Sequence, residues 1–258
     1  MAAHTLYGWI ALAIASIAAG LVNAIAGGGT LISFPTLLAM GVPAIDASVT
    51  NTVALSPGYL GGTLAQREDL VGQRPRLLRL VPSAMLGGIV GGLLLLLTSE
   101  AIFARIVPFL ILLACASLAS QDRIRAWIAR RQQREGARSK ARRKIPGVLA
   151  VFLASVYGGY FGAGLGILLL AVLGVVLDDT LVRLNALKQA LSLTINMTAA
   201  LFFLFSGRVA WPMAAVMALG SLLGGHLGGR IAKRLDPALL RRAVIALGLV
   251  IAGIHLAR

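Results

Sequence analysis

Long apolar stretches, separated by short polar breaks, fill almost the whole chain. A helix that crosses a bilayer needs about 20 mainly apolar residues. The stretches that approach or exceed this length are 6–26, 47–65, 77–97, 101–119, 148–157 with its continuation, 181–205, 210–232 and 238–256. Because backbone groups in lipid must be satisfied within their own segment, these stretches predict helices. The pattern therefore predicts an all-α polytopic membrane protein with about eight hydropathy-level spans.

Glycine clusters interrupt two of these stretches. Residues 26–29 precede a short apolar run at 31–40, and residues 158–166 precede another at 167–177. About twelve helical residues span only ~18 Å, which is less than the ~30 Å hydrocarbon core. We therefore expect each short run to be a half-helix in a broken re-entrant hairpin, inside the protein or against a water-filled cavity.

The chain also resembles itself at an offset of 137 residues, which places Gly29 on Gly166. One set of four glycines coincides with a second set: Gly87, Gly88, Gly91 and Gly92 with Gly224, Gly225, Gly228 and Gly229. The matches predict two homologous transmembrane repeats, 1–119 and 146–258, joined by a linker at 120–145. Glycines spaced four apart favour close helix packing, within the monomer or between monomers, so a homo-oligomer stays open.

Composition supports the membrane interpretation and changes the meaning of the charge. With 58% hydrophobic and 13% charged residues, the chain has too few polar side chains to cover a soluble domain. A net charge of +15 would suggest nucleic acid on a soluble protein. Here residues 121–144 hold ten Lys and Arg against two acidic residues, with no nucleic-acid-binding motif. We expect a cytoplasmic loop that can also contact anionic lipid headgroups, and no nucleic-acid partner.

The positions of the cations predict the topology. We let each repeat contribute one broken hairpin and three crossings, with the linker inside. All of the 24 Lys and Arg except Arg105, Arg208 and Arg258 then lie on the inner side, as the positive-inside rule requires. Because three crossings is an odd number, the two repeats are inverted relative to each other, as in many secondary carriers.

The interior offers hydrogen-bond donors rather than carboxylates. Almost every Asp and Glu lies at a predicted membrane edge or in a loop, which argues against a buried Na⁺ or metal site, and no cofactor is expected. The N-termini of the half-helices present backbone N–H groups that attract anions. The candidate substrate-binding residues lie at these N-termini or on the helix that follows each of them. They are Gly27, Gly28, Gly29, Thr30, Asn51, Thr52, Gly164, Gly166, Asn185, Lys188 and Gln189. Lys188 either extends to the cytoplasmic edge or faces the cavity as a counter-charge.

Four segments resemble the paired signatures of the TauE/SafE family of membrane permeases. The stretch Asn-Ala-Ile-Ala-Gly-Gly-Gly-Thr-Leu-Ile-Ser-Phe-Pro at 23–35 and the stretch at 46–52 are similar to the first signature, and those at 157–166 and 183–189 to the second. The resemblance implies a multi-pass protein of the bacterial cell inner membrane. It also implies export of sulfite or of small organosulfonates such as sulfoacetate.

The predicted function is therefore a secondary transporter that exports a small anion by alternating access, with sulfite or an organosulfonate as the leading candidate for that anion. An uptake permease for another small organic anion or sulfur compound has the same architecture and stays open. An intramembrane enzyme or an assembly factor is the remote alternative. An enzyme would need a nucleophile–base pair or a metal cluster within the spans, where His226 is the one buried titratable group we expect, so we predict no enzyme activity.

Overall fold

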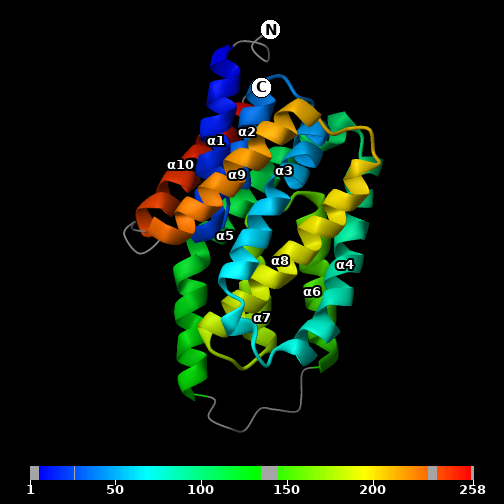
Figure 1. Ribbon diagram of the computed structural model, residues 1–258. Coiled ribbons are helices and arrows are strands. Elements are labelled where there is room, and N and C mark those ends of the chain that lie inside the picture. The colour runs from blue at the N-terminus through cyan, green and yellow to red at the C-terminus, as the bar shows by residue number, and fades with distance from the viewer. Residues whose placement is uncertain (1–5, 26, 135–143, 232–236, 257–258) are drawn as a thin grey trace.

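The computed structural model describes residues 6–25, 27–134, 144–231 and 237–256, and in these residues every regular element is a helix (Figure 1). The elements are α1 (Leu6–Ile25), α2 (Thr30–Ala39), α3 (Ala44–Ala65), η2 (Glu68–Leu70), α4 (Arg74–Leu97), α5 (Glu100–Arg134), α6 (Lys144–Tyr160), α7 (Leu165–Val176), α8 (Leu181–Leu204), α9 (Trp211–Ile231) and α10 (Pro237–Leu256). The prediction of an all-α chain is confirmed for the described residues.

Both predicted half-helices are present. The short helix α2 has 10 residues and α7 has 12, and each follows a break in the expected place. Gly28 and Gly164 adopt φ values of +124° and +73° at the two breaks. Residues with a Cβ rarely adopt such positive φ values, so the glycines allow the chain to reverse between the two legs.

Four of the described helices are long and apolar enough to cross a membrane: α1, α4, α5 and α8. The stretch at 47–65 lies within α3, which is also long at 22 residues but has a lower hydropathy because of its Ser, Thr and Asn residues. Length and composition therefore support a multi-pass membrane protein.

One predicted boundary is different in the structure. The apolar stretch that we expected to end at residue 119 continues as α5 to Arg134, so the first part of the predicted linker is helical. Residues 121–134 lack Gly and Pro and are rich in Ala, Arg and Gln, which favour helix. Ile128 is also buried against Gly174 of α7, so packing holds this extension in place. The rest of the linker to residue 143 lies outside the described residues.

The glycine sets fit neighbouring helices together. A Cβ on Gly91 of α4 would lie 2.1 Å from the carbonyl oxygen of Val156 in α6. A Cβ on Gly224 of α9 would lie 1.9 Å from the carbonyl oxygen of Ile17 in α1. The expectation of close helix packing is thus confirmed within the monomer for α4 on α6 and α9 on α1.

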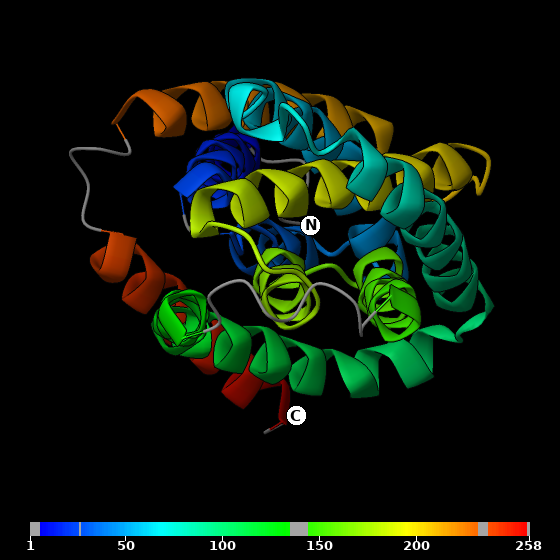
Figure 2. The same ribbon diagram turned by 90° about the horizontal axis from the view of Figure 1, so that it is seen from below.

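The two half-helices lie inside the bundle. Figure 2 shows α7 near the centre of the molecule, with α5 along one side and α8 along the other. Leu118 of α5 lies against Gly28 at the first break, and Ala114, one turn earlier, lies against Gly164 at the second. Both breaks therefore meet the same part of α5.

Candidate functional site

The first break is closed by a side chain of the chain itself. The Asn23 carboxamide oxygen accepts hydrogen bonds from the amides of Gly28 (3.1 Å) and Gly29 (2.8 Å), and the amide of Gly27 donates to the carbonyl of Val22 (2.9 Å). The expectation that these glycines present free N–H groups is therefore wrong. Asn is a favourable helix-capping residue, and here it acts from the end of α1 across the break.

The other predicted residues of the first half satisfy one another. Asn51 accepts a hydrogen bond from the Ser33 hydroxyl (2.5 Å) and donates to the Thr30 hydroxyl (3.5 Å), so α3 is tied to the first turn of α2. Thr52 donates instead to the carbonyl of Ser48 within α3 (3.0 Å). All of these side chains are buried. In this conformation the first break is a closed polar cluster.

Replacing Asn23 by alanine should lower the free energy of unfolding by about 1 kcal/mol, because two amides at the start of α2 lose their acceptor. Thermal unfolding of the detergent-solubilised protein measures this effect. Asn23→Asp is the matched control, since it keeps an oxygen acceptor at the same place. Equal loss of stability in both variants would contradict a capping role.

The second break has no such cap. Within the described residues, neither the Gly164 amide nor the Gly166 amide has a hydrogen-bond acceptor, and no side chain caps α7. The end of the Lys188 side chain lies beside this helix start: Cδ, Cε and Nζ are each 3.7 Å from the point where a Cβ on Gly166 would be. Of the two orientations left open by the sequence, the structure thus has Lys188 facing α7.

A chain of polar side chains leads from Lys188 through Asn185 of α8 to Gln66, the residue that follows α3. Its ammonium group donates to the Asn185 carboxamide oxygen (3.0 Å), and the Asn185 amide donates to the Gln66 carboxamide oxygen (2.7 Å). Gln189 is buried with its side chain against Gly62 of α3. Within the described residues no carboxylate pairs with Lys188, so its positive charge is solvated by neutral groups alone.

The structure therefore divides the predicted residues into two groups. Gly28, Gly29, Thr30 and Asn51 lie together at the first break, which Asn23 caps. The predicted residues of the second break lie around an uncapped helix start beside the Lys188 ammonium group. The sequence analysis did not predict that Asn23 caps the first break. An Asn a few residues before a glycine cluster could have indicated such a cap. Gln66, which is brought to Asn185 from 119 residues away, was also not predicted. His226, expected to be buried, has an exposed side chain on α9.

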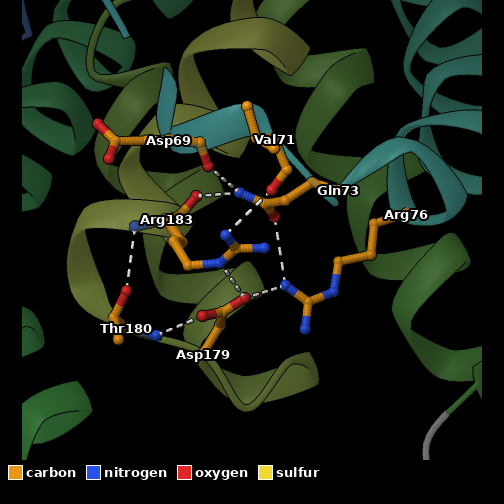
Figure 3. A network of polar contacts seen from close by, with 7 residues as sticks. All are labelled: Asp69, Val71, Gln73, Arg76, Asp179, Thr180 and Arg183. Atoms are coloured by element: carbon orange, nitrogen blue, oxygen red, sulfur yellow. Dashed lines mark hydrogen bonds and ion pairs between the residues drawn. The ribbon is translucent and has the colours of Figure 1, made fainter. Parts of the chain in front are cut away.

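A polar network joins the start of α4 to the start of α8 at the lower end of the molecule (Figures 1 and 3). The Asp179 carboxylate accepts hydrogen bonds from Arg76 and from Arg183 Nε (3.0 Å). The buried Gln73 amide donates to the Arg183 carbonyl (3.0 Å), and its oxygen accepts from Arg76 (3.2 Å). Arg183 also donates to the Val71 carbonyl (3.1 Å). The network connects one predicted repeat to the other.

Acid should weaken this network. Burial raises the pKa of Asp179, but the hydrogen bonds from Arg76 and Arg183 outweigh it and hold the pKa below its ordinary value. A carboxyl group whose pKa is lower in the folded than in the unfolded protein stabilises the fold at pH values above its unfolded-state pKa, which is about 3.9 for Asp. This stabilisation is lost as the pH falls through the folded-state pKa. We expect Asp179→Asn to lower the melting temperature at pH 7, and this deficit to shrink below about pH 4. Melting curves between pH 3 and pH 7 measure it, and a constant deficit would contradict the assignment.

A second set of contacts lies at the opposite end. Arg208, in the turn between α8 and α9, donates to the Asp46 carboxylate in α3 (3.1 Å). The Ala210 amide donates to the Thr50 hydroxyl (3.0 Å). The Glu100 carboxylate accepts from the first amides of α3, where the helix dipole favours a negative group.

Comparison with known proteins identifies the family. The family model described as sulfite exporter TauE/SafE matches residues 12–255. The chain belongs to the TauE/SafE family. A probable membrane transporter protein of Haemophilus influenzae is 29% identical over 211 residues, which cover 79% of this chain and 77% of the relative. The probable membrane transporter protein YfcA of Escherichia coli K12 is 25% identical over 210 residues, covering 78% and 72%. No solved structure matches the chain.

Membership of the TauE/SafE family confirms the resemblance seen in the sequence and supports a membrane transporter of a small molecule. Among the described residues, no group of three or more His, Cys, Asp or Glu side chains is arranged to hold a metal ion. The groups that the structure places at the second break are backbone amides, neutral polar side chains and the Lys188 ammonium group.

Proposed function

We propose that this TauE/SafE protein exports a small anion, sulfite or an organosulfonate, from the cytoplasm by alternating access. The observation that carries the proposal is Lys188, which lies beside the unpartnered amides at the start of α7 and has no carboxylate partner among the described residues. A helix N-terminus and an unneutralised ammonium group both favour a negative ligand. In this conformation Gly164, Gly166, Asn185, Lys188 and Gln189 line the anion site, while the first break holds the bundle together.

Exchanged helix contacts support two inverted repeats. Under the 137-residue offset, α1 to α5 correspond to α6 to α10. The first helix of each repeat packs on the fourth helix of the other repeat: α1 packs on α9, and α6 packs on α4. The third helix of each repeat also packs on the fourth helix of the other: α3 packs on α9, and α8 packs on α4. The helices α3 and α8 contact each other, as do α5 and α10. Such an exchange is expected if a pseudo-two-fold axis relates the repeats 1–119 and 146–258, each a hairpin with three crossings.

The distribution of charge supports the proposed orientation in a bacterial inner membrane. The end of α5, the start of α6 and the network around Asp179 lie at the lower end in Figure 1, whereas the turn with Arg208 lies at the upper end. Among the described residues, the cations of 67–79, of the end of α5 and of the start of α8 thus gather toward this end. We propose that this end, with the linker 120–145, is cytoplasmic. The inside-negative potential then assists anion export by about 2.3 kcal/mol per charge per 100 mV.

Transport by the purified protein tests the proposal. Proteoliposomes are loaded with sulfite, sulfoacetate or taurine, and efflux is followed with and without an imposed membrane potential. We expect efflux of at least one of these compounds, faster when the potential is negative on the side that carries the linker. Absence of efflux of all three, from protein that is folded and inserted, would refute the export function.

A further inference from the structure

We propose that two equivalent latches, one at each end of the molecule, gate access to the anion site, and that the latch farther from the linker opens first. The inner latch, at the end that includes the linker, comprises the contacts of Arg183 with Val71 and Asp179. The outer latch is the ion pair of Asp46 with Arg208. This inference rests on the proposed function, because gates are needed only if the site is reached from each side in turn.

The two latches occupy equivalent positions in the two repeats. The 137-residue offset places Asp46 on Arg183 and Val71 on Arg208. The Arg183 guanidinium donates to the Val71 carbonyl (3.1 Å), and the Arg208 guanidinium donates to the Asp46 carboxylate (3.1 Å). In each latch, the first turn of the third helix of one repeat thus contacts the connection between the third and fourth helices of the other repeat. Correspondence in both position and partner indicates that the latches share one role.

A second hydrogen bond accompanies each latch at a further pair of equivalent positions. The offset places Gln73 on Ala210. The Gln73 side chain donates to the Arg183 carbonyl (3.0 Å), and the Ala210 amide donates to the hydroxyl of Thr50, one turn after Asp46 (3.0 Å). Each latch is therefore reinforced two residues further along the chain, and separation of the repeats at either end breaks both contacts there.

Each latch lies nearer its end of the molecule than the polar residues of the two breaks. Lys188 is five residues after Arg183, and its offset equivalent Asn51 is five residues after Asp46. A rise of 1.5 Å per residue places both about 7–8 Å further along their helices than the latch residues. In Figure 1 the connection between α3 and α4 lies at the lower end and the turn between α8 and α9 at the upper end. Opening one latch therefore gives access from one side alone.

The two latches differ in strength. The Asp179 carboxylate of the inner latch accepts from Arg76 as well as from Arg183, and its side chain is 13% exposed (Figure 3). In the outer latch the side chains of Arg208 and Asp46 are 43% and 28% exposed. Exposed ion pairs contribute little because water screens the charges, whereas less exposed hydrogen bonds to a charged group contribute more. The outer latch therefore breaks first and opens the protein to the side opposite the linker, as release of an exported anion requires.

Thiol labelling of the full-length protein in proteoliposomes tests the latches. Val49 and Ala186 are offset equivalents, and each is fully buried about one turn further along its helix than the latch residue. Val49→Cys and Ala186→Cys therefore serve as reporters, in separate chains that carry Cys115→Ala. The probe is N-ethylmaleimide, which crosses the bilayer. Val49→Cys should react faster than Ala186→Cys, and an equal or slower reaction would overturn the order of opening.

Variants of the latches distinguish a gate from a structural contact. Asp46→Asn should raise the labelling rate at position 49 by about twofold to fivefold and lower it at position 186. Asp179→Asn should raise the rate at position 186 by about tenfold or more and lower it at position 49. The effects are opposite because the two ends of an alternating-access transporter do not open together. Equal increases at both reporters, which a general loosening of the fold produces, would refute the latches.

The outcomes separate this inference from the proposed function, because labelling needs no substrate. If labelling follows the latches but sulfite, sulfoacetate and taurine all stay in the proteoliposomes, export of these compounds fails and the latches stand as gates for another solute. If an anion is exported but neither latch variant changes labelling at its own end, the latches are refuted and the export function stands.

Discussion

Lys188→Gln is expected to abolish most anion transport. It removes the ammonium group that lies beside Gly166 while keeping a polar side chain with a hydrogen-bond donor at this position. A hydrogen bond to a charged group contributes about 1.5–3 kcal/mol, so we expect affinity to fall by about tenfold to hundredfold. Efflux of sulfite and of sulfoacetate from proteoliposomes measures the change.

The comparison with two other variants makes this result specific. Lys188→Arg keeps the charge and should retain part of the transport. Arg208→Gln removes a cation at the opposite end of the molecule, where it pairs with Asp46, and should leave affinity for the anion unchanged. Normal transport by Lys188→Gln would show that the ammonium group does not contact the anion.

Gly224→Ala is expected to have the largest effect on stability. Its Cβ would lie 1.9 Å from the carbonyl oxygen of Ile17, so α9 and α1 must move apart along their whole interface. Backbone atoms cannot rotate away as a side chain can, and overpacking of this kind costs about 1–3 kcal/mol or more. Thermal unfolding in detergent micelles measures the loss.

The neighbouring glycine provides the control. Gly225 has no atom within 4 Å of the position of a Cβ, so Gly225→Ala meets open space. Alanine is the better helix former by about 1 kcal/mol, so this variant should be as stable as wild type or more stable. If the two substitutions shifted the melting temperature equally, the α1–α9 contact would not explain the role of the glycine set.

Much of the fold could be predicted because the signals are local. Apolar length located the helices, and the glycine clusters located both breaks, since each depends only on residues adjacent in the chain. The end of α5 could not be located in this way. A charged segment such as 121–134 has the same composition as a solvated loop, and only its contact with α7 through Ile128 shows that it is part of the bundle.

The candidate site could be predicted only in part, and the two breaks show why. Both present the same glycine-rich pattern, so the sequence treated their amides as equivalent donors. In the structure Asn23 occupies the amides of Gly28 and Gly29, whereas no side chain caps the start of α7. Whether a side chain bends back across a break depends on how the two legs pack, which residue types alone do not determine.

The sequence by itself thus determined that the protein lies in a membrane, where its helices and their two breaks lie, and that it carries an excess of positive charge. Composition and the lengths of the apolar stretches fix these features without reference to distant residues. Only the tertiary structure decided which break is capped by a side chain, that Lys188 faces α7, and that Gln66 lies against Asn185 beside it. These facts depend on contacts between α3, α7 and α8 over long sequence separations. A hydrogen bond or a charge interaction requires its partners to be close in space, and the packing of the helices sets those distances.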